Sequence, residues 1–298
     1  PAPAGDLSLA DLRATTDELL ASGASIHEMN AVRKHLSATK GGRLASAAAP
    51  ATVATLLFSD VVGDDASVIG SGPFTPDETS HEDALGVVER YGLNLPTAVV
   101  AHLRAGVDGT HPETPTADDP AFERVTEHLL ASNHTAAWAA LEEARDAGYE
   151  PMLLSTRVRG EAREAAKSAV AVGEEIAATG NPIEPPAVVV TGGETTVTVR
   201  TEDPGTGGPN AEYALSAALE LDASGVVVAA VDTDGIDGTA SIAGASVDGT
   251  LVTPEHRRQA QRALDSHDAA TYLRARDAAI DTGATGTNVN DLRVVVVE

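Results

Sequence analysis

Two valine-rich runs, each followed directly by glycines and acids, limit the fold more than any other feature of this sequence. AVVV precedes the loop TGGETTVTV (191–199), and GVVVAAV leads into VDTDGIDG (231–238). Short apolar runs bounded by turn residues are typical of buried strands. In open α/β proteins, the loops that follow such strands meet at an edge of the sheet where ligands bind. Together with a third loop, TGATGTNVND (282–291), they predict a site for a negatively charged, metal-bound substrate such as a nucleotide.

The rest of the chain alternates predicted strands with amphipathic helices, which indicates an α/β fold with a largely parallel sheet. Ser25 and Glu28 form a capping-box pattern at the start of one helix. The prolines of NPIEPP (181–186) predict a linker, so we expect domains over 1–185 and 186–298. Further strands are predicted at 51–63, 151–155 and 292–298, and helices at 8–22, 25–36, 80–92, 96–106, 120–132, 134–148, 160–180, 209–221 and near 253–264.

The balance of charge is strongly acidic, with 45 acids against 20 lysines and arginines and a formal charge of −25. Such a charge argues against a nucleic-acid partner, because phosphate binding needs a basic face. The scarcity of lysine favours a protein of a salt-accumulating halophile, and an ordinary acidic protein is the alternative. The chain has no cysteine and therefore no thiolate metal site. No apolar run could span a bilayer and no signal-peptide pattern opens the chain, so we expect a cytoplasmic protein.

One dense basic cluster stands out in this acidic chain. Arg33, Lys34, His35, Lys40 and Arg43 lie within eleven residues, and Asp60 is the sole acid from Ala31 to Val61. A strongly negative protein must concentrate cations to attract an anionic substrate. The cluster therefore predicts an anion-binding site, and a solvated helix face is the alternative.

Two groups of aspartates are candidate metal ligands. Asp60, Asp64 and Asp65 follow the strand predicted at 51–63, and Asp232, Asp234 and Asp237 lie in the loop DTDGIDG. Carboxylates of this kind can hold Mg²⁺ together with substrate oxygens, whereas the EF-hand pattern fails. Helix capping and turn formation are the alternatives for each aspartate. The loop TGGETTVTV most simply predicts the tip of a β-hairpin, which could still present its N–H groups to phosphate.

The histidines outside the basic cluster, His81, His102 and His267 among them, show no metal-binding spacing, and we expect them at the surface. Neither a Walker A pattern nor GxGxxG occurs in the chain. The common NTPase loop and the common dinucleotide fingerprint are therefore not available.

The chain resembles the glycerate kinases that end in a MOFRL domain. The matching segments occur in family order and cover nearly all of the chain: NAVRKHLSATKGGRLA, FSDVVGDDASVIGSGPFTPD, ALGVVERYGLNLP, GEAREAAK, VTGGETTVTV, GGPNAEYALSAALEL, VDTDGIDGTASIAGASVDGT and TGATGTNVNDL. The resemblance implies a partial Rossmann-like parallel-sheet domain followed by a smaller α/β MOFRL domain, with the site in the cleft between them. It also implies phosphorylation of D-glycerate by ATP and Mg²⁺, most simply at the 2-hydroxyl, and a homodimer is compatible with it.

Roles for single residues follow from the resemblance as hypotheses. Lys40 and Asp64 are the expected catalytic residues, with Asp64 as the base, and Asp60 and Asp234 are the expected metal ligands. Substrate binding is assigned to Arg33, Lys34 and His35, and nucleotide binding to Gly192, Gly193, Glu194, Thr195, Asn210, Thr285 and Asn288.

The chain departs from the family pattern at three places. Pro209 replaces an arginine and Ala284 replaces a proline that are usual in the family. Relatives also carry a further segment ahead of the position of Pro1, so we expect the isolated chain to lack part of the family's site. A hydroxypyruvate reductase and a ligand-binding fragment without activity are the alternative functions.

Overall fold

The computed structural model describes residues 2–298 and divides the chain into two compact units. Unit 1 comprises the chain up to Leu57 together with Asp64–Leu129, and unit 2 comprises Phe58–Gly63 and Leu130–Glu298. This division differs from the expected one at 185/186. The segment NPIEPP is a loop inside unit 2, because the strands before and after it pair with each other.

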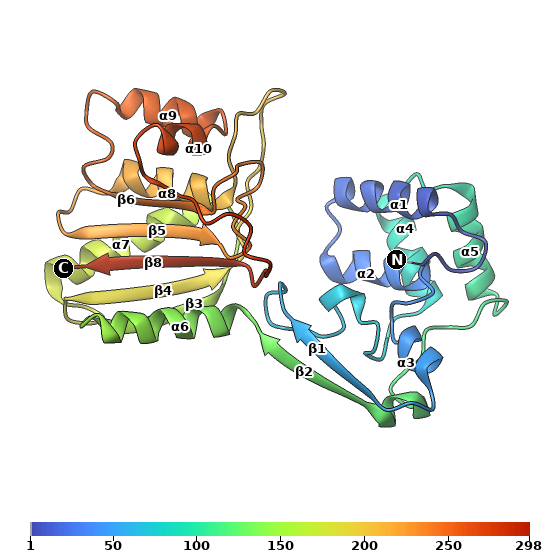
Figure 1. Cartoon of the computed structure of the whole chain (residues 1–298). Helices are drawn as coiled ribbons and strands as arrows, with labels where there is room; N and C mark the ends of the chain where they lie inside the picture. The colour runs from blue at the N-terminus through green and yellow to red at the C-terminus, as the bar shows by residue number, and fades with distance from the viewer. Residues whose placement is uncertain (1) are drawn as a thin grey trace. The chain divides into compact units, whose positions relative to one another are not determined.

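Unit 1 is mainly helical (Figure 1). Its helices are α1 (Leu9–Ser22), α2 (Ile26–His35), α3 (Arg43–Ala48), α4 (His81–Tyr91) and α5 (Thr97–Val107), with short 3₁₀ segments η1 (Ile69–Ser71) and η2 (Pro120–Arg124). The four longer helices bury a shared core that includes Leu19, Val32, Val88 and Leu103. Capping boxes begin α1, α2 and α4, and the one predicted at Ser25 and Glu28 is confirmed.

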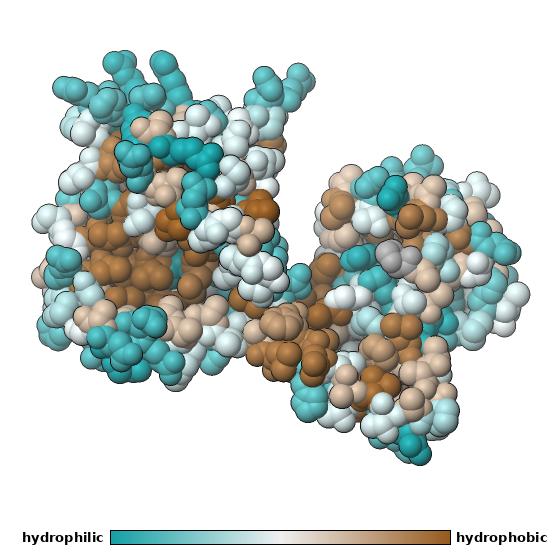
Figure 2. Space-filling model, in the orientation of Figure 1, coloured by the Kyte–Doolittle hydropathy of each residue, from teal (hydrophilic) through white to brown (hydrophobic). Residues whose placement is uncertain are grey.

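A two-stranded sheet is formed by β1 (Val53–Phe58) and β2 (Val125–Ala131). A strand forms within the predicted range 51–63. The prediction that this strand is buried is wrong, because alternate residues of β1 face solvent. The helix predicted over 120–132 is also wrong. Asp119 caps the short η2 turn and the backbone then extends to pair with β1. Figure 2 shows hydrophobic residues over these two strands, and Leu56, Phe58, Leu129 and Leu130 are exposed there.

Unit 2 contains a six-stranded sheet in the order β3-β4-β8-β5-β6-β7. Its strands are β3 (Glu150–Val158), β4 (Ala187–Gly193), β5 (Val226–Asp232), β6 (Gly244–Asp248), β7 (Ala279–Ile280) and β8 (Asp291–Val297). Only the β3–β4 pair is parallel; the other pairs between described strands of this sheet are antiparallel. The α/β fold class is confirmed, whereas the sheet is mixed and not largely parallel.

Helices cover both faces of this sheet. The helix α6 (Asn133–Asp146) packs on one face, and α7 (Ala162–Thr179) and α8 (Pro209–Glu220) pack on the other. Two further helices, α9 (Arg257–Asp265) and α10 (Ala269–Arg274), lie against α8. The hairpin interpretation of TGGETTVTV is wrong, because β4 pairs with β3 and β8 and the chain then leaves the sheet. Among residues 2–298, no helix combines the length and the apolar character needed to cross a membrane.

Candidate functional site

One edge of the unit 2 sheet brings the three predicted loops together. Because β8 runs antiparallel to both neighbours, its first residue, Asp291, lies at the edge where β4 and β5 end. Asp291 pairs with Gly193 on one side and with Asp232 on the other. The predicted convergence of the loops at one end of the strands is therefore confirmed. We call this end of the sheet, with Asp232, Asp234, Asp237 and Asp291, the acidic edge.

Asn210 and Asp237 form the buried base of the acidic edge. The Asn210 side chain donates hydrogen bonds to Asp237 at 3.2 Å and to Asp291 at 2.7 Å. The backbone N–H groups of Asn210 and Ala211 also donate to the Asp237 carboxylate, at 2.9 and 2.7 Å, so it caps the N-terminus of α8. Burial raises the pKa of Asp237 to about 6, against the effect of these hydrogen bonds. Asp237 thus has a capping role, and Asn210 holds two carboxylates in position.

Asp232 and Asp234 are the half-buried carboxylates of the acidic edge. One oxygen of Asp232 accepts the N–H of Asp234 at 3.1 Å, and one oxygen of Asp234 accepts the N–H of Ile236 at 2.7 Å. Burial, and then the charges of Asp291, Asp234 and Asp237, raise the pKa of Asp232 to about 6. Crowded carboxylates of this kind are relieved by a divalent cation. These residues therefore fit Mg²⁺, which prefers carboxylate oxygens combined with water and phosphate.

Two further acids extend this region. Partial burial, followed by the charges of Asp291 and Asp60, raises the pKa of Glu194. Asp60, a predicted metal ligand, belongs to the Phe58–Gly63 segment of unit 2 and is exposed. Below the acids lies the buried guanidinium of Arg293, which donates to Thr195 Oγ1 at 2.8 Å and also to Asp291.

The glycine loop after β4 directs two of its N–H groups toward acceptors of the protein itself. The N–H of Glu194 donates to the Val158 carbonyl at 2.9 Å, and that of Thr195 faces Asp291 Oδ2 at 3.4 Å. Both N–H groups therefore have acceptors within the protein in this structure, and the nucleotide-binding role of this loop stays a prediction.

Packing explains both glycines of this loop. A Cβ on Gly192 would lie 1.7 Å from Asn133 Oδ1, and a Cβ on Gly193, whose φ is +126°, would lie 2.3 Å from the Val158 carbonyl oxygen. Neither position has room for a side chain.

The loop 282–288 is attached to the DTDGIDG loop. The Thr285 hydroxyl donates to the Thr233 carbonyl at 2.6 Å, and the Thr285 N–H donates to the Asp234 carbonyl at 2.9 Å. Asn288 is exposed and accepts the N–H of Asn290 at 2.9 Å. Thr285 and Asn288, both predicted to bind nucleotide, thus lie in an exposed loop next to Asp234.

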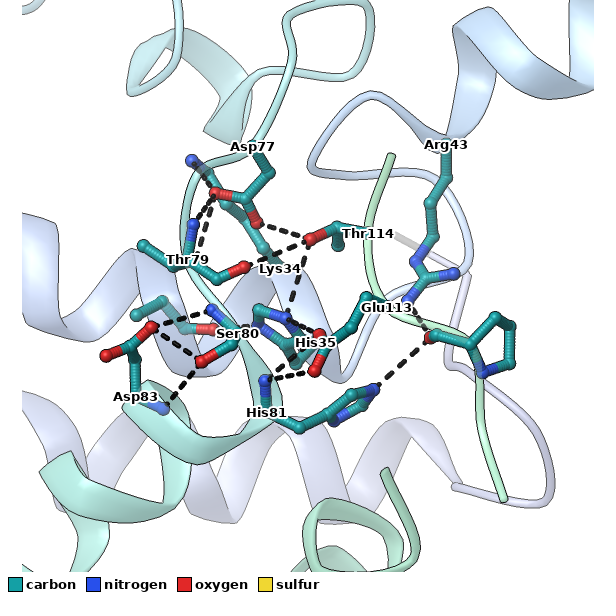
Figure 3. Close-up of polar contacts among 12 residues, drawn as sticks. Lys34, His35, Arg43, Asp77, Thr79, Ser80, His81, Asp83, Glu113 and Thr114 are labelled. Carbon is teal, nitrogen blue, oxygen red and sulfur yellow. Dashed lines mark hydrogen bonds and ion pairs between the residues drawn. The ribbon is translucent and has the colours of Figure 1, made fainter. Parts of the chain in front are cut away.

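In unit 1, Lys34 and His35 point into the interior (Figure 3). The Lys34 ammonium lies 3.0 Å from Asp77, and both side chains are buried. Burial alone would raise the pKa of Asp77, but the charge of Lys34 and hydrogen bonds from Lys34 and Thr79 outweigh it and lower this pKa. His35 Nε2 lies 3.1 Å from Glu113. Both predicted substrate ligands are therefore already paired inside the unit.

Arg33 and Lys40, unlike Lys34 and His35, are only partly buried. They line, with Arg13 of α1, a pocket of about 340 Å³. The Lys40 ammonium donates to the Gly70 carbonyl at 2.6 Å and to the Ser71 hydroxyl at 3.0 Å. Burial, and then the charge of Arg33, lower the pKa of Lys40 to about 8. One carboxylate, Asp17, lines the same pocket, so the three cations leave it with a net positive charge that suits a small carboxylate anion.

Two further residues of interest have clear local positions. Asp64, the predicted base, lies in the loop after β1 with a φ of 60°, a conformation that aspartate tolerates better than most residues. Pro209, which replaces the family's usual arginine, is the first residue of α8, where proline is well accommodated.

Sequence reasoning missed Asp291 and Arg293. Both lie at the start of the last strand, and Asp291 meets Asp232 because β8 lies between β4 and β5. One signal in the sequence points to Asp291: it ends the loop TGATGTNVND and directly precedes the apolar run LRVVVV.

The fold and the acidic edge define an α/β protein with a site suited to metal-bound anionic ligands. The sequence matches the domain of unknown function DUF4147 over residues 1–104 and the MOFRL family over residues 187–291. A glycerate 2-kinase of Pyrococcus horikoshii is 40% identical, with 99% of this chain aligned to 67% of that protein. A proposed hydroxypyruvate reductase of Agrobacterium vitis is 43% identical, with 99% of this chain aligned to 66% of that protein.

The crystal structure of a glycerate kinase from Thermotoga maritima superposes with a TM-score of 0.87 at 37% identity, covering 99% of this chain and 69% of that one. The chain therefore belongs to the glycerate 2-kinase family whose members carry a MOFRL segment. It spans about two thirds of the length of these relatives.

Proposed function

We propose that the protein phosphorylates D-glycerate with ATP, at the 2-hydroxyl, to give 2-phosphoglycerate. The single observation that carries this proposal is the acidic edge of unit 2, found in a chain that belongs to the glycerate 2-kinase family. Phosphoryl transfer depends on positioning and on neutralising the charge of the transferred group. The acidic edge and the cationic pocket supply chemically different parts of that task.

We assign the metal ligands to the acidic edge. Asp232 and Asp234 would hold Mg²⁺, with Asp60 as a further candidate, and the ion would neutralise the phosphates of ATP when it is bound. Thr285 and Asn288 lie in the exposed loop beside Asp234 and would contact the nucleotide. Asn210 and Asp237 hold Asp291 in place and act as positioning residues.

We assign the binding of glycerate to the pocket lined by Arg33 and Lys40. Arginine and lysine at such a site would bind the substrate carboxylate through charge-assisted hydrogen bonds. Asp64 is the proposed base that accepts the proton of the attacking hydroxyl. Lys34 is paired with Asp77, and we give it a structural role.

The reaction is tested by incubating the protein with ATP, Mg²⁺ and D-glycerate and measuring ADP, with ³¹P–¹H NMR to locate the new phosphate ester. Formation of 2-phosphoglycerate supports the proposal. The name of the Agrobacterium vitis relative makes oxidation of NADH by hydroxypyruvate the competing activity. NADH oxidation without ADP formation would overturn the kinase proposal.

We further propose that the protein works in a salt-rich cytoplasm. This rests on the formal charge of −25 and on the three lysines among the 20 cations. Self-repulsion of that size destabilises a compact fold in dilute buffer and is screened by salt.

A further inference from the structure

Two buried histidines and a glutamate meet inside unit 1 (Figure 3). None of the three lines the pocket of Arg33 and Lys40. His35 ends α2, His81 begins α4, and Glu113 lies in the segment between α5 and η2. The two imidazole rings are fully buried, and their centroids are 4.5 Å apart. One ligand atom from each of the three residues can be chosen so that all lie within 4.8 Å of one another.

The groups around His35 determine which of its two ring nitrogens carries the proton when the ring is neutral. His35 Nδ1 lies 2.7 Å from the carbonyl oxygen of Ala31, which can only accept a hydrogen bond, so Nδ1 carries the proton. The lone pair of neutral His35 is then on Nε2. That nitrogen faces Glu113 Oε2 at 3.1 Å, and a carboxylate is also an acceptor.

The same reasoning applies to His81. Its Nε2 lies 3.3 Å from the Pro112 carbonyl oxygen and therefore donates, which leaves the lone pair on Nδ1. His81 Nδ1 has no hydrogen-bond partner among residues 2–298, although it is buried. The ring is fixed by close packing on α5, since a Cβ on Gly106 would lie 2.2 Å from it.

Glu113 accepts the backbone N–H of His81 at 3.1 and 3.2 Å, and the Thr114 hydroxyl lies 3.5 Å from His35 Nε2. His81 Nδ1 is the acceptor that still lacks a donor among residues 2–298. A proton on His35 Nε2 would form an ion pair with Glu113 but would leave the buried Nδ1 of His81 unsatisfied, which is costly. A divalent metal ion would satisfy both imidazole lone pairs and the carboxylate together. We propose that His35 Nε2, His81 Nδ1 and Glu113 bind a transition-metal ion of the Zn²⁺ type.

The chemistry of this set fits Zn²⁺ in particular. Two histidines and one glutamate are a known zinc ligand set, with bond lengths of about 2.0–2.2 Å, which place tetrahedral ligands about 3.3 Å apart. The His35–Glu113 distance of 3.1 Å is already close to this value. Each histidine donates its other N–H to a backbone carbonyl, the usual support of a zinc-bound imidazole.

A pocket of about 480 Å³ borders Glu113 and gives the ion a path from solvent. His102 and His111 also line this pocket, and their rings are stacked with centroids 4.4 Å apart. Glu113 is half exposed at 47%, so a fourth position occupied by water can face the pocket. The ion would link α2, α4 and the segment before η2, and it would therefore stabilise unit 1.

The test uses chain stripped with a chelator and then titrated with Co²⁺ and Zn²⁺ in excess MgCl₂, which occupies the surface carboxylates. We expect one ion per chain, visible absorption bands of four-coordinate Co²⁺ that Zn²⁺ abolishes, and a higher thermal midpoint with Zn²⁺. Glu113→Gln should weaken binding at least about tenfold. His111→Asn is the matched control and should bind as the original chain does.

Side-chain ¹H–¹⁵N NMR of the unmodified chain tests the site without a variant. On adding Zn²⁺, the Nε2 signal of His35 and the Nδ1 signal of His81 should shift together at one equivalent. Unchanged signals, the absence of stoichiometric binding, or equal affinity in Glu113→Gln and the original chain would each overturn the proposal. The kinase proposal does not depend on this result, because no residue of the zinc site belongs to the acidic edge or lines the pocket of Arg33 and Lys40.

Discussion

Asp291 and Asp232 lie directly opposite each other where β8 pairs with β5. Two carboxylates at adjacent strand ends repel each other unless a proton or a cation intervenes. The raised pKa of Asp232, about 6, is a direct consequence of burial at this position and of the neighbouring acids. The acidic edge is therefore destabilised in the absence of a cation and prepared to bind one.

Replacing Asp232 with asparagine should stabilise the protein at neutral pH without Mg²⁺. The folded protein holds this proton more tightly than the unfolded chain, whose pKa is near 3.8. The stability contribution is thus complete below pH 3.8 and is lost as the pH rises through about 6. We expect a gain of about 1–2 kcal/mol at pH 7.5 and little change at pH 4, after allowing for partial exposure. Urea unfolding at both pH values measures it, and excess MgCl₂ should abolish the gain.

Binding of glycerate should weaken above pH 8. The pKa of Lys40 is lowered to about 8 by burial and by Arg33, so the ammonium loses its proton as the pH rises through that value. The KM for glycerate should increase several-fold between pH 7 and pH 9.5, while the KM for ATP changes less. In Lys40→Arg the increase should be absent, because arginine stays protonated. A flat profile in the original protein would remove Lys40 from the binding site.

Gly192→Ala should destabilise the protein through a clash with Asn133, independently of any ligand. The added Cβ would lie 1.7 Å from Asn133 Oδ1. We expect a loss of about 1–3 kcal/mol, as for other overpacked cores. In an Asn133→Ala background the same substitution should cost much less, and a double-mutant cycle measures this coupling. Equal costs in both backgrounds would contradict the packing explanation.

The thermal midpoint should rise with salt. With a formal charge of −25, screening of self-repulsion favours the folded state. We expect the midpoint in molar KCl to exceed that in dilute buffer by several degrees. Greater stability in dilute buffer would contradict the halophilic assignment.

The parts of the fold that the sequence predicts correctly are those with strong local signals. The capping box at Ser25 and Glu28 begins α2 as expected, and the valine runs form β4, β5 and β8. By contrast, β6 (GASVD) has no apolar run to reveal it. The position of β8 between β4 and β5 depends on pairing across the whole of unit 2 and leaves no local pattern.

The loops of the candidate site can be predicted from the sequence, but the residues that pair with their side chains in the fold cannot. Lys34 belongs to a basic cluster in sequence, yet it pairs with Asp77, 43 positions away. His81 and His267 were expected at the surface, and both are buried. His267 contacts the buried Glu212 at 2.5 Å, a pairing that only the tertiary fold creates.

If the acidic edge holds the metal-bound nucleotide of a glycerate kinase, removal of the Asp234 carboxylate should abolish most of the activity. The measurement is kcat/KM for D-glycerate in the ADP-forming assay, for the original protein and for Asp234→Ala, with unfolding curves as a check on folding. We expect formation of 2-phosphoglycerate by the original protein and a loss of about 100-fold or more in kcat/KM for the variant. A folded variant whose kcat/KM stays within about threefold of the original would contradict it.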